Sequence, residues 1–78
     1  MNSLAARFAA KEALAKAVGD PKLLSWNEIE VVKDSLGKPH FNFHGETLQR
    51  MQELNLKFHL SLSHELELAT ALVVLEAL

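Results

Sequence analysis

The stretch LKFHLSLSH, residues 56–64, alternates apolar and polar side chains, and this period of two limits what the chain can fold into. Successive side chains of an extended strand point to opposite faces of a sheet. The apolar residues therefore share one face and the polar residues share the other: Phe58, Leu60 and Leu62 against His59, Ser61 and Ser63. The pattern predicts a half-buried strand.

Two further segments with the same period predict a β-hairpin. In SWNEIEVVK, residues 25–33, the apolar and acidic residues alternate: Ile29 and Val31 against Glu28 and Glu30. In PHFNFH, residues 39–44, aromatic and polar side chains separate in the same way: Phe41 and Phe43 against His40, Asn42 and His44. Between them lies the turn DSLGK, residues 34–38, whose glycine is available for a positive φ. The apolar run ATALVVLEA, residues 69–77, is short enough to be a buried strand.

An alanine-rich segment predicts a helix over residues 3–18. Alanine and leucine favour helices, and Ser3 is a suitable N-cap. Gly19, Asp20 and Pro21 then end the helix.

A second helix is predicted over residues 46–54, directly after Gly45. Leu48 and Met51 fall on one face of it, and Leu54 follows on the same side. The predicted order of elements is therefore α-β-β-α-β-β. This order indicates an α+β domain in which helices pack against antiparallel strands.

The composition excludes several classes of protein. With 78 residues the chain is long enough for one domain only, and 49% of its residues are hydrophobic, as in globular proteins. A net charge of −2 argues against a general binder of nucleic acids or membrane surfaces, which would be basic. The chain has no cysteine, and no apolar stretch reaches the ~18 residues of a membrane span. We therefore expect a cytoplasmic protein.

The first predicted helix carries charges where an apolar stripe is expected. At 100° per residue, one side of the helix holds mainly apolar residues: Leu4, Phe8, Leu14 and Val18. Lys11 points into the middle of that side. In a purely structural interpretation, Glu12 and Lys16 form an i,i+4 ion pair and Lys11 extends its ammonium past the apolar surface. In a functional interpretation, Glu12 lies at the rim of a cleft and holds a hard cation, while the lysines neutralise phosphates.

The segment RFAAKEALAKA resembles the second signature of the holo-acyl-carrier-protein synthases, within the 4′-phosphopantetheinyl transferase superfamily. The matching positions are Phe8, Lys11, Glu12 and Lys16. Farther along, SWNEIEVVKDSLGKPHFNFHG is similar to the family's tryptophan, strand, Gly-Lys-Pro turn and following strand. FHLSLSHELELATALVVLE is similar to its serine- and histidine-containing segment and closing strand. The resemblance runs from about Leu4 to Glu76.

The resemblance implies a reaction and a set of site residues. Members of the family transfer the 4′-phosphopantetheine arm of coenzyme A to a serine of an acyl carrier protein in fatty acid biosynthesis, with Mg²⁺ at the pyrophosphate. By resemblance, Glu12 is the metal-binding and catalytic glutamate and Lys16 contacts the transferring phosphate. Arg7, Lys11, Ser63 and His64 are expected to contact the coenzyme A phosphates. The short members of the family are usually homotrimers with sites between subunits.

One expected part of the family pattern is missing. The family has an N-terminal strand with a Gly-x-Asp motif, whose aspartate is the second protein ligand of Mg²⁺. Asp20 and Asp34 both follow the Lys-Glu signature and lie in turns, so neither matches it. We therefore expect residues 1–78 to be a single domain that lacks this segment and has little activity alone. The alternatives are a non-catalytic fragment or degenerate relative that binds coenzyme A or a protein, and an unrelated small α+β binding domain.

Three other features of the sequence also have two interpretations. His40 and His44 share a strand face and could form a metal pair, but no third ligand is evident. His59 lies on a polar face, where it could simply form a hydrogen bond. Trp26 is expected to be a packing residue at the start of its strand.

Overall fold

The predicted order of elements is confirmed by the computed structural model, which describes residues 4–65 and 68–78, with the side chains of residues 64 and 65 outside that description. The elements are α1 (Leu4–Val18), β1 (Ile29–Lys33), β2 (Pro39–Phe43), α2 (Gly45–Leu54), β3 (Leu56–Glu65) and β4 (Leu68–Ala77). Two short 3₁₀ turns that the sequence did not predict, η1 (Pro21–Leu23) and η2 (Trp26–Glu28), connect α1 to β1. The fold is α+β, as expected. The predicted N-cap, Ser3, lies outside the described residues.

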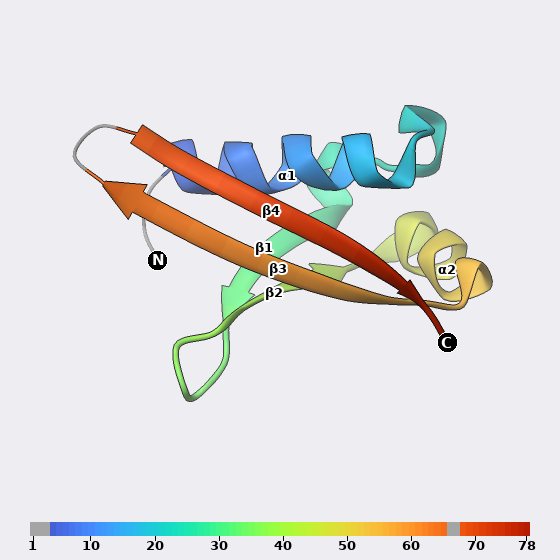
Figure 1. Ribbon diagram of the computed structural model, residues 1–78. Coiled ribbons are helices and arrows are strands. Elements are labelled where there is room, and N and C mark those ends of the chain that lie inside the picture. Colours follow the sequence, from blue (N-terminus) through green and yellow to red (C-terminus); the bar gives the residue numbers. More distant parts are fainter. Residues whose placement is uncertain (1–3, 66–67) are drawn as a thin grey trace.

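The four strands form two antiparallel hairpins (Figure 1). In the first hairpin Val31 is opposite Phe41, and in the second Leu60 is opposite Val73. The two hairpins meet through Phe43, whose ring stacks with Phe41 at 5.9 Å and meets the edge of the Phe58 ring at 5.2 Å. The aromatic faces predicted from the alternation therefore join β2 to β3.

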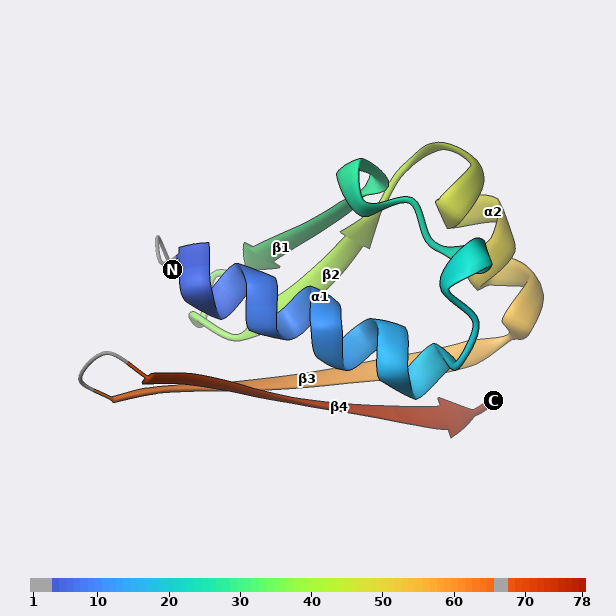
Figure 2. The ribbon, with the colours of Figure 1, turned by 90° about the horizontal axis from the view of Figure 1, so that it is seen from above.

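Helix α1 packs on the β3–β4 hairpin, mainly against β4. Figure 2 shows it running between that hairpin and the β1–β2 hairpin. Its buried residues are Ala6, Ala10 and Leu14. Of the predicted apolar stripe, Leu14 is fully buried as expected and Val18 is half-buried, but the prediction is wrong for Leu4 and Phe8, which are 78% and 58% exposed. The alanines lie against a strand whose inner face is also rich in small residues, and this lets the two backbones pack closely.

The prediction that β4 is a buried strand is also wrong. Its residues alternate between half-buried and exposed, and Leu72 and Val74 are 61% and 49% exposed. The reason is that α1 covers only one face of the β3–β4 hairpin. Within the described residues, no helix has both the length and the apolar character needed to cross a membrane.

Thr47 joins three segments of the chain. It is the fully buried polar residue of α2, and its hydroxyl Oγ1 accepts a hydrogen bond from Ser25 N at 2.9 Å. The same hydroxyl donates to Glu28 Oε1 at 2.8 Å, and Thr47 N donates to that oxygen at 3.1 Å. Glu28 therefore caps the N-terminus of α2 from a distant segment. Residues 26–28 form η2, in which Glu28 N donates to Ser25 O at 2.9 Å, and β1 begins at Ile29 instead of near Ser25 as predicted.

Helix α2 buries a different pair of residues from the predicted one. Met51 is 2% exposed, as expected, but the other buried residue is Thr47, while Leu48 and Leu54 are each 37% exposed. The helix begins at Gly45, whose φ is +59°. A Cβ on this glycine would collide with the carboxylate of Glu28. The Glu28 cap therefore depends on a residue without a side chain at position 45.

The glycine requirement gives a first prediction. Replacing Gly19, which has a φ of +85° and no atom within 4 Å of an added Cβ, costs only the left-handed backbone term of about 1–2 kcal/mol. Gly45→Ala carries the same term and also displaces Glu28, so it lowers the unfolding free energy by more than Gly19→Ala. Urea unfolding of the two variants measures the difference. Equal destabilisation would contradict the proposed dependence of the cap on Gly45.

The Glu28 cap gives a second prediction. The hydrogen bond from the Thr47 hydroxyl, followed by the one from its backbone, holds the pKa of Glu28 below its ordinary value of 4.5. The stabilisation from the charged carboxylate is therefore fully present above pH 4.5 and is lost as the pH falls through the lowered pKa. Glu28→Gln should destabilise the chain at pH 7, and this difference from wild type should shrink at acidic pH. A difference that is the same at both pH values in urea titrations would contradict the assignment.

Candidate active site on the first helix

Two hollows lie beside α1 and share two basic residues. One, of about 150 Å³, lies between the helix and β1 and is lined by Arg7, Lys11, Ile29, Glu30 and Val31. The other, of about 320 Å³, lies toward η2 and is lined by Leu4, Arg7, Phe8, Lys11 and Trp26. Arg7 and Lys11 line both, so the structure brings together two of the residues predicted to contact phosphates. The larger hollow reaches the size of small-molecule sites, about 300–1,000 Å³.

The ammonium of Lys11 is held by Trp26. Lys11 Nζ donates a hydrogen bond of 3.2 Å to the backbone oxygen of Trp26 and lies 5.6 Å from the centroid of the Trp26 ring. Phe8 packs on the same ring, with 5.6 Å between ring centroids. Trp26 is therefore a packing residue, as expected, but it packs in the turn before β1, is 43% exposed and contacts a predicted site residue.

Glu12 and Lys16 are exposed on the same helix and form no ion pair with each other or with any other residue of the described ranges. The predicted i,i+4 pair is therefore not found. Lys16 lies in the last turn of α1, where a positive charge favours the helix dipole. Neither side chain lines the two hollows, so the structure places this pair on α1 but not in the hollows with Arg7 and Lys11.

Ser63 and His64 lie near the end of β3. Both ribbon views place this end of β3 beside the N-terminal end of α1, which is the end that carries Arg7 (Figures 1 and 2). Ser63 is exposed. The side chain of His64 lies outside the described residues. The backbone therefore gathers Arg7 and the Ser63–His64 segment at one end of the molecule, while Lys16 lies at the other end of the helix.

The donors present fit Mg²⁺ only with help from a substrate. Among the described residues, no group of three or more His, Asp or Glu side chains could hold a metal ion. Glu12 is a single exposed carboxylate without a hydrogen-bond or ion-pair partner among the described residues, and Mg²⁺ in proteins commonly takes one or two carboxylates together with substrate phosphates. The structure thus fits a metal held jointly by Glu12 and phosphate oxygens.

His40 of β2 and His44, which directly follows β2 and is the N-cap of α2, each bond a different carboxylate instead of forming a metal pair. His40 Nε2 donates to Asp34 Oδ2 at 3.0 Å, and His44 Nε2 donates to Glu30 Oε1 at 3.1 Å. The hydrogen bond from His40 holds the pKa of Asp34 below its usual value. Each imidazole is therefore paired with its own carboxylate.

His59 forms the hydrogen bond expected from its polar face. It donates to Glu76 Oε1 at 2.9 Å across the β3–β4 hairpin. This bond lowers the pKa of Glu76.

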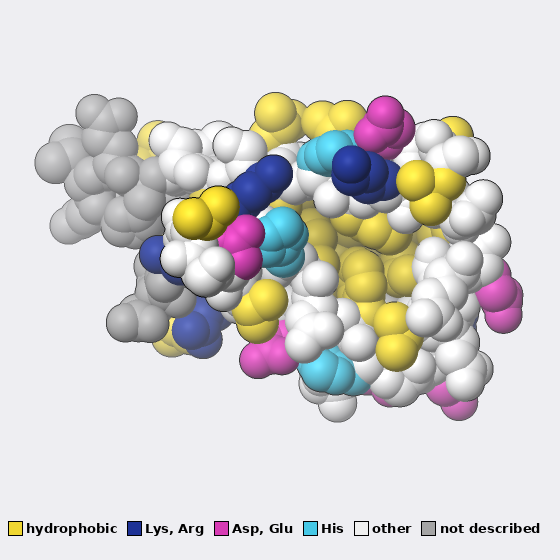
Figure 3. All heavy atoms as spheres, turned by 90° about the horizontal axis from the view of Figure 1, so that it is seen from below, with side chains coloured by type: hydrophobic (Ala, Val, Ile, Leu, Met, Phe, Trp, Pro, Cys, Tyr) yellow, Lys and Arg dark blue, Asp and Glu magenta, His cyan; other side chains and the backbone are white. Residues whose placement is uncertain are grey.

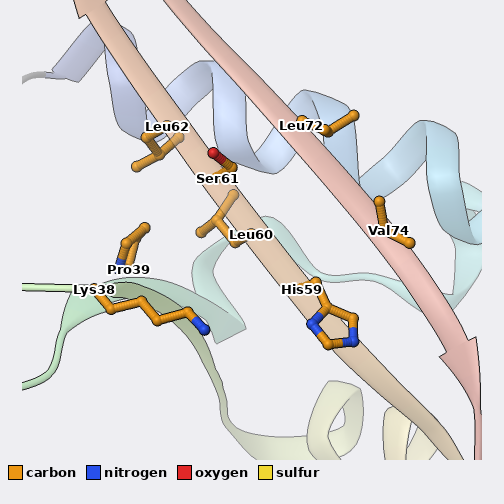
Figure 4. Close-up of a pocket in the computed structure, with 8 residues that line it drawn as sticks. All are labelled: Lys38, Pro39, His59, Leu60, Ser61, Leu62, Leu72 and Val74. Carbon is orange, nitrogen blue, oxygen red and sulfur yellow. The ribbon is translucent and has the colours of Figure 1, made fainter.

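An apolar groove lies on another face, between β2 and the β3–β4 hairpin. On the face shown in Figure 3, hydrophobic side chains gather in a hollow with His and basic side chains at its edge. The groove has a volume of about 390 Å³ and is lined by Lys38, Pro39, His59, Leu60, Ser61, Leu62, Leu72 and Val74. Figure 4 shows Leu60 and Leu62 extending toward the Lys38–Pro39 segment. None of the predicted site residues lines it, so we place the candidate site on α1.

Sequence reasoning missed how Trp26 and Glu30 contribute to the hollows. Trp26 lies 15 positions after Lys11, and no local periodicity connects residues so far apart. One signal was present: Phe8 and Lys11 are three residues apart, so a helix places an aromatic ring and a cation on the same side. That pairing predicts an aromatic environment for Lys11 but not the identity of its second aromatic neighbour.

The sequence is similar to proteins with an assigned activity. It is 52% identical over 75 residues to the holo-[acyl-carrier-protein] synthase of Clavibacter michiganensis, covering 95% of this chain and 63% of that protein. Over the same length it is 48% identical to the enzyme of that name from Streptomyces griseus, covering 95% of this chain and 62% of the relative. The chain thus spans a little under two thirds of these relatives.

Solved structures and a family model agree with these similarities. The fold matches the crystal structure of Helicobacter pylori holo-[acyl-carrier-protein] synthase in complex with coenzyme A, with a TM-score of 0.73 and 33% identity over 92% of this chain and 63% of that one. It also matches the Plasmodium yoelii holo-ACP synthase, with a TM-score of 0.66 and 36% identity over 90% of this chain and 54% of that one. The model of the 4′-phosphopantetheinyl transferase superfamily matches residues 1–71. The chain therefore belongs to the 4′-phosphopantetheinyl transferase superfamily.

Proposed function

We propose that this chain is part of a holo-[acyl-carrier-protein] synthase that transfers the 4′-phosphopantetheine group of coenzyme A to a serine of an acyl carrier protein. The observation that carries the proposal is α1 itself: Arg7 and Lys11 line two adjoining hollows, and the helix also presents Glu12 and Lys16, which are exposed and form no ion pair within the described part of the chain. The names of the relatives and the coenzyme A bound to the Helicobacter protein support this function.

The reaction assigns a task to each charged group. The serine oxygen of the carrier protein forms a bond to the phosphorus next to the pantetheine arm. The bond from that phosphorus to the bridging oxygen breaks, and adenosine 3′,5′-bisphosphate leaves. Negative charge grows on the leaving phosphate, so Lys16 lowers the barrier by neutralising it. The serine gives up its proton, and Glu12 is the group on α1 proposed to position or accept it through water.

The other basic residues bind the substrate. Arg7 and Lys11 are proposed to contact coenzyme A phosphates in the two hollows, and Ser63 and His64 to contact them from the end of β3. Mg²⁺, held by Glu12 and the pyrophosphate oxygens, would neutralise charge on the pyrophosphate.

The proposal extends to the assembly and the place of the reaction. We propose a homotrimer, an acyl carrier protein as protein partner, and a cytoplasmic role in fatty acid biosynthesis. Residues 1–78 are proposed to act as one domain. The alternative is a non-catalytic fragment or degenerate relative that binds coenzyme A or a protein. What favours this alternative is the single carboxylate of the metal site.

A third prediction tests whether Glu12 and Lys16 on α1 contribute to stability. Because Glu12 and Lys16 are exposed and make no ion pair among the described residues, Glu12→Gln and Lys16→Gln should each change the unfolding free energy by less than about 0.5 kcal/mol. Urea unfolding of both variants measures this, with Leu14→Ala as the control that must destabilise, since Leu14 is fully buried. A loss well above 0.5 kcal/mol in either charge variant would favour a structural role.

A fourth prediction tests the proposed function. Calorimetry should detect binding of coenzyme A that is stronger with Mg²⁺, and Glu12→Ala should abolish the Mg²⁺-dependent part because it removes the carboxylate. If the wild-type chain does not bind coenzyme A, the proposed function is wrong. Binding that ignores both Mg²⁺ and Glu12→Ala would favour the binding-module alternative.

The transfer reaction itself needs a separate assay. With coenzyme A, Mg²⁺ and an apo acyl carrier protein, we expect the 78-residue chain alone to modify little or none of the carrier, because one carboxylate holds Mg²⁺ weakly. Mass spectrometry of the carrier protein measures the product. Normal turnover would contradict this expectation.

A further inference from the structure

We infer that Trp26 is a positioning residue for Lys11: its backbone oxygen and its indole ring together hold the Lys11 ammonium where the two hollows meet. The identity of the ligand that benefits, a phosphate of coenzyme A, rests on the proposed function. The contact between Trp26 and Lys11 is independent of the proposed function.

Two different parts of one residue hold the same ammonium. The backbone oxygen of Trp26 accepts a hydrogen bond from Lys11 Nζ at 3.2 Å, and the ring centroid lies 5.6 Å from that nitrogen, within the ~6 Å range of cation–π attraction. A lysine side chain is long and flexible, and fixing it costs conformational entropy. Because Trp26 already restricts the Lys11 side chain, ligand binding costs less of this entropy.

The turn that carries Trp26 is itself fixed on both sides. Ser25 N donates to Thr47 Oγ1 at 2.9 Å, and Glu28 accepts from Thr47 at 2.8 Å. Phe8 packs against the indole, 5.6 Å between centroids and tilted by 49°. Contacts with α2 and α1 therefore fix the position of the indole ring. The ring in turn fixes the position of the Lys11 ammonium.

The arrangement leaves Lys11 able to bind an anion. An ammonium has three hydrogen-bond donors, and the backbone oxygen of Trp26 accepts from one of them. Lys11 makes no ion pair with a carboxylate in the described residues. The carboxylate of Glu30 lines the smaller hollow, where it accepts hydrogen bonds from Asn42 and His44, whereas no carboxylate of the described residues lines the larger one. Within this part of the chain, the ammonium of Lys11 is therefore oriented and free of a direct ion pair at the larger hollow, as a phosphate site requires.

A ligand-free measurement tests the contact. The methylene protons of Lys11 nearest the nitrogen lie close to the indole, so NMR should show ring-current shifts for them in the wild type. Trp26→Leu should remove these shifts, and Trp26→Phe should keep shifts of the same sign because it retains an aromatic face. Far-UV circular dichroism confirms that each variant is folded. Unchanged Lys11 shifts in folded Trp26→Leu would overturn the inference.

A binding cycle tests the consequence. Trp26→Leu should weaken coenzyme A binding by about two- to five-fold, the range of an exposed cation–π contact, and Trp26→Phe should recover most of the loss. In the Lys11→Met background, Trp26→Leu should have no further effect. Binding of pantetheine, which has no phosphate, should not respond to either change.

The outcomes separate the two proposals. An equal loss from Trp26→Leu with and without Lys11 would overturn the positioning role, because Trp26 would then act on the ligand by itself. If the wild-type chain binds no coenzyme A, the proposed function fails. The NMR shifts then decide alone whether Trp26 positions Lys11.

Discussion

The hydroxyl of Thr47 is the point on which the arrangement of the site depends. It is buried, and it satisfies one backbone donor before η2 and one carboxylate within it. A buried hydroxyl without partners would be costly, so these segments are held to α2. The turn between Ser25 and Glu28 consequently has one position, and this turn brings the indole of Trp26 to α1. Thr47 therefore holds the turn at Ser25 and Glu28, and Trp26 within this turn holds Lys11. These contacts connect a core threonine to a cation near the surface.

Helix α1 packs against the β3–β4 hairpin with one face and carries the candidate site residues on another. Ala6, Ala10 and Leu14 pack it on the β3–β4 hairpin, and the two alanines are small enough for a close approach. The remaining surface is then available for Phe8, Lys11 and the charged residues around them. With large side chains in place of Ala6 and Ala10, the helix would stand farther from β4, and its charged residues would reach different positions. The small residues therefore set where the candidate site lies as well as how the helix packs.

The sequence predicted the order of elements, the β1–β2 hairpin and the alternating faces of β2 and β3, because a period of two is a local property. It failed where side chains act over long distances. Glu28 was predicted as a strand residue, yet its carboxylate caps α2, and Thr47 was not among the residues predicted to be buried in the second helix, yet it is fully buried. On α1 four large apolar residues suggested the buried face, but only Leu14 of them is buried, and Ala6 and Ala10 form the rest of that face. For the site, the family signature identified Lys11 and Arg7 as candidates, whereas the contribution of Trp26 needed the fold.

The central claim is that the hollow between α1 and Trp26 binds a phosphate-bearing ligand next to Lys11. Trp26 is the only tryptophan of the chain, which has no tyrosine, so its fluorescence reports on this hollow alone. Titration with coenzyme A should produce a saturable change in Trp26 emission, and Lys11→Met should shift the midpoint to higher concentration. A chain that binds coenzyme A by calorimetry while Trp26 emission stays constant would contradict the claim, because the ligand would then bind elsewhere.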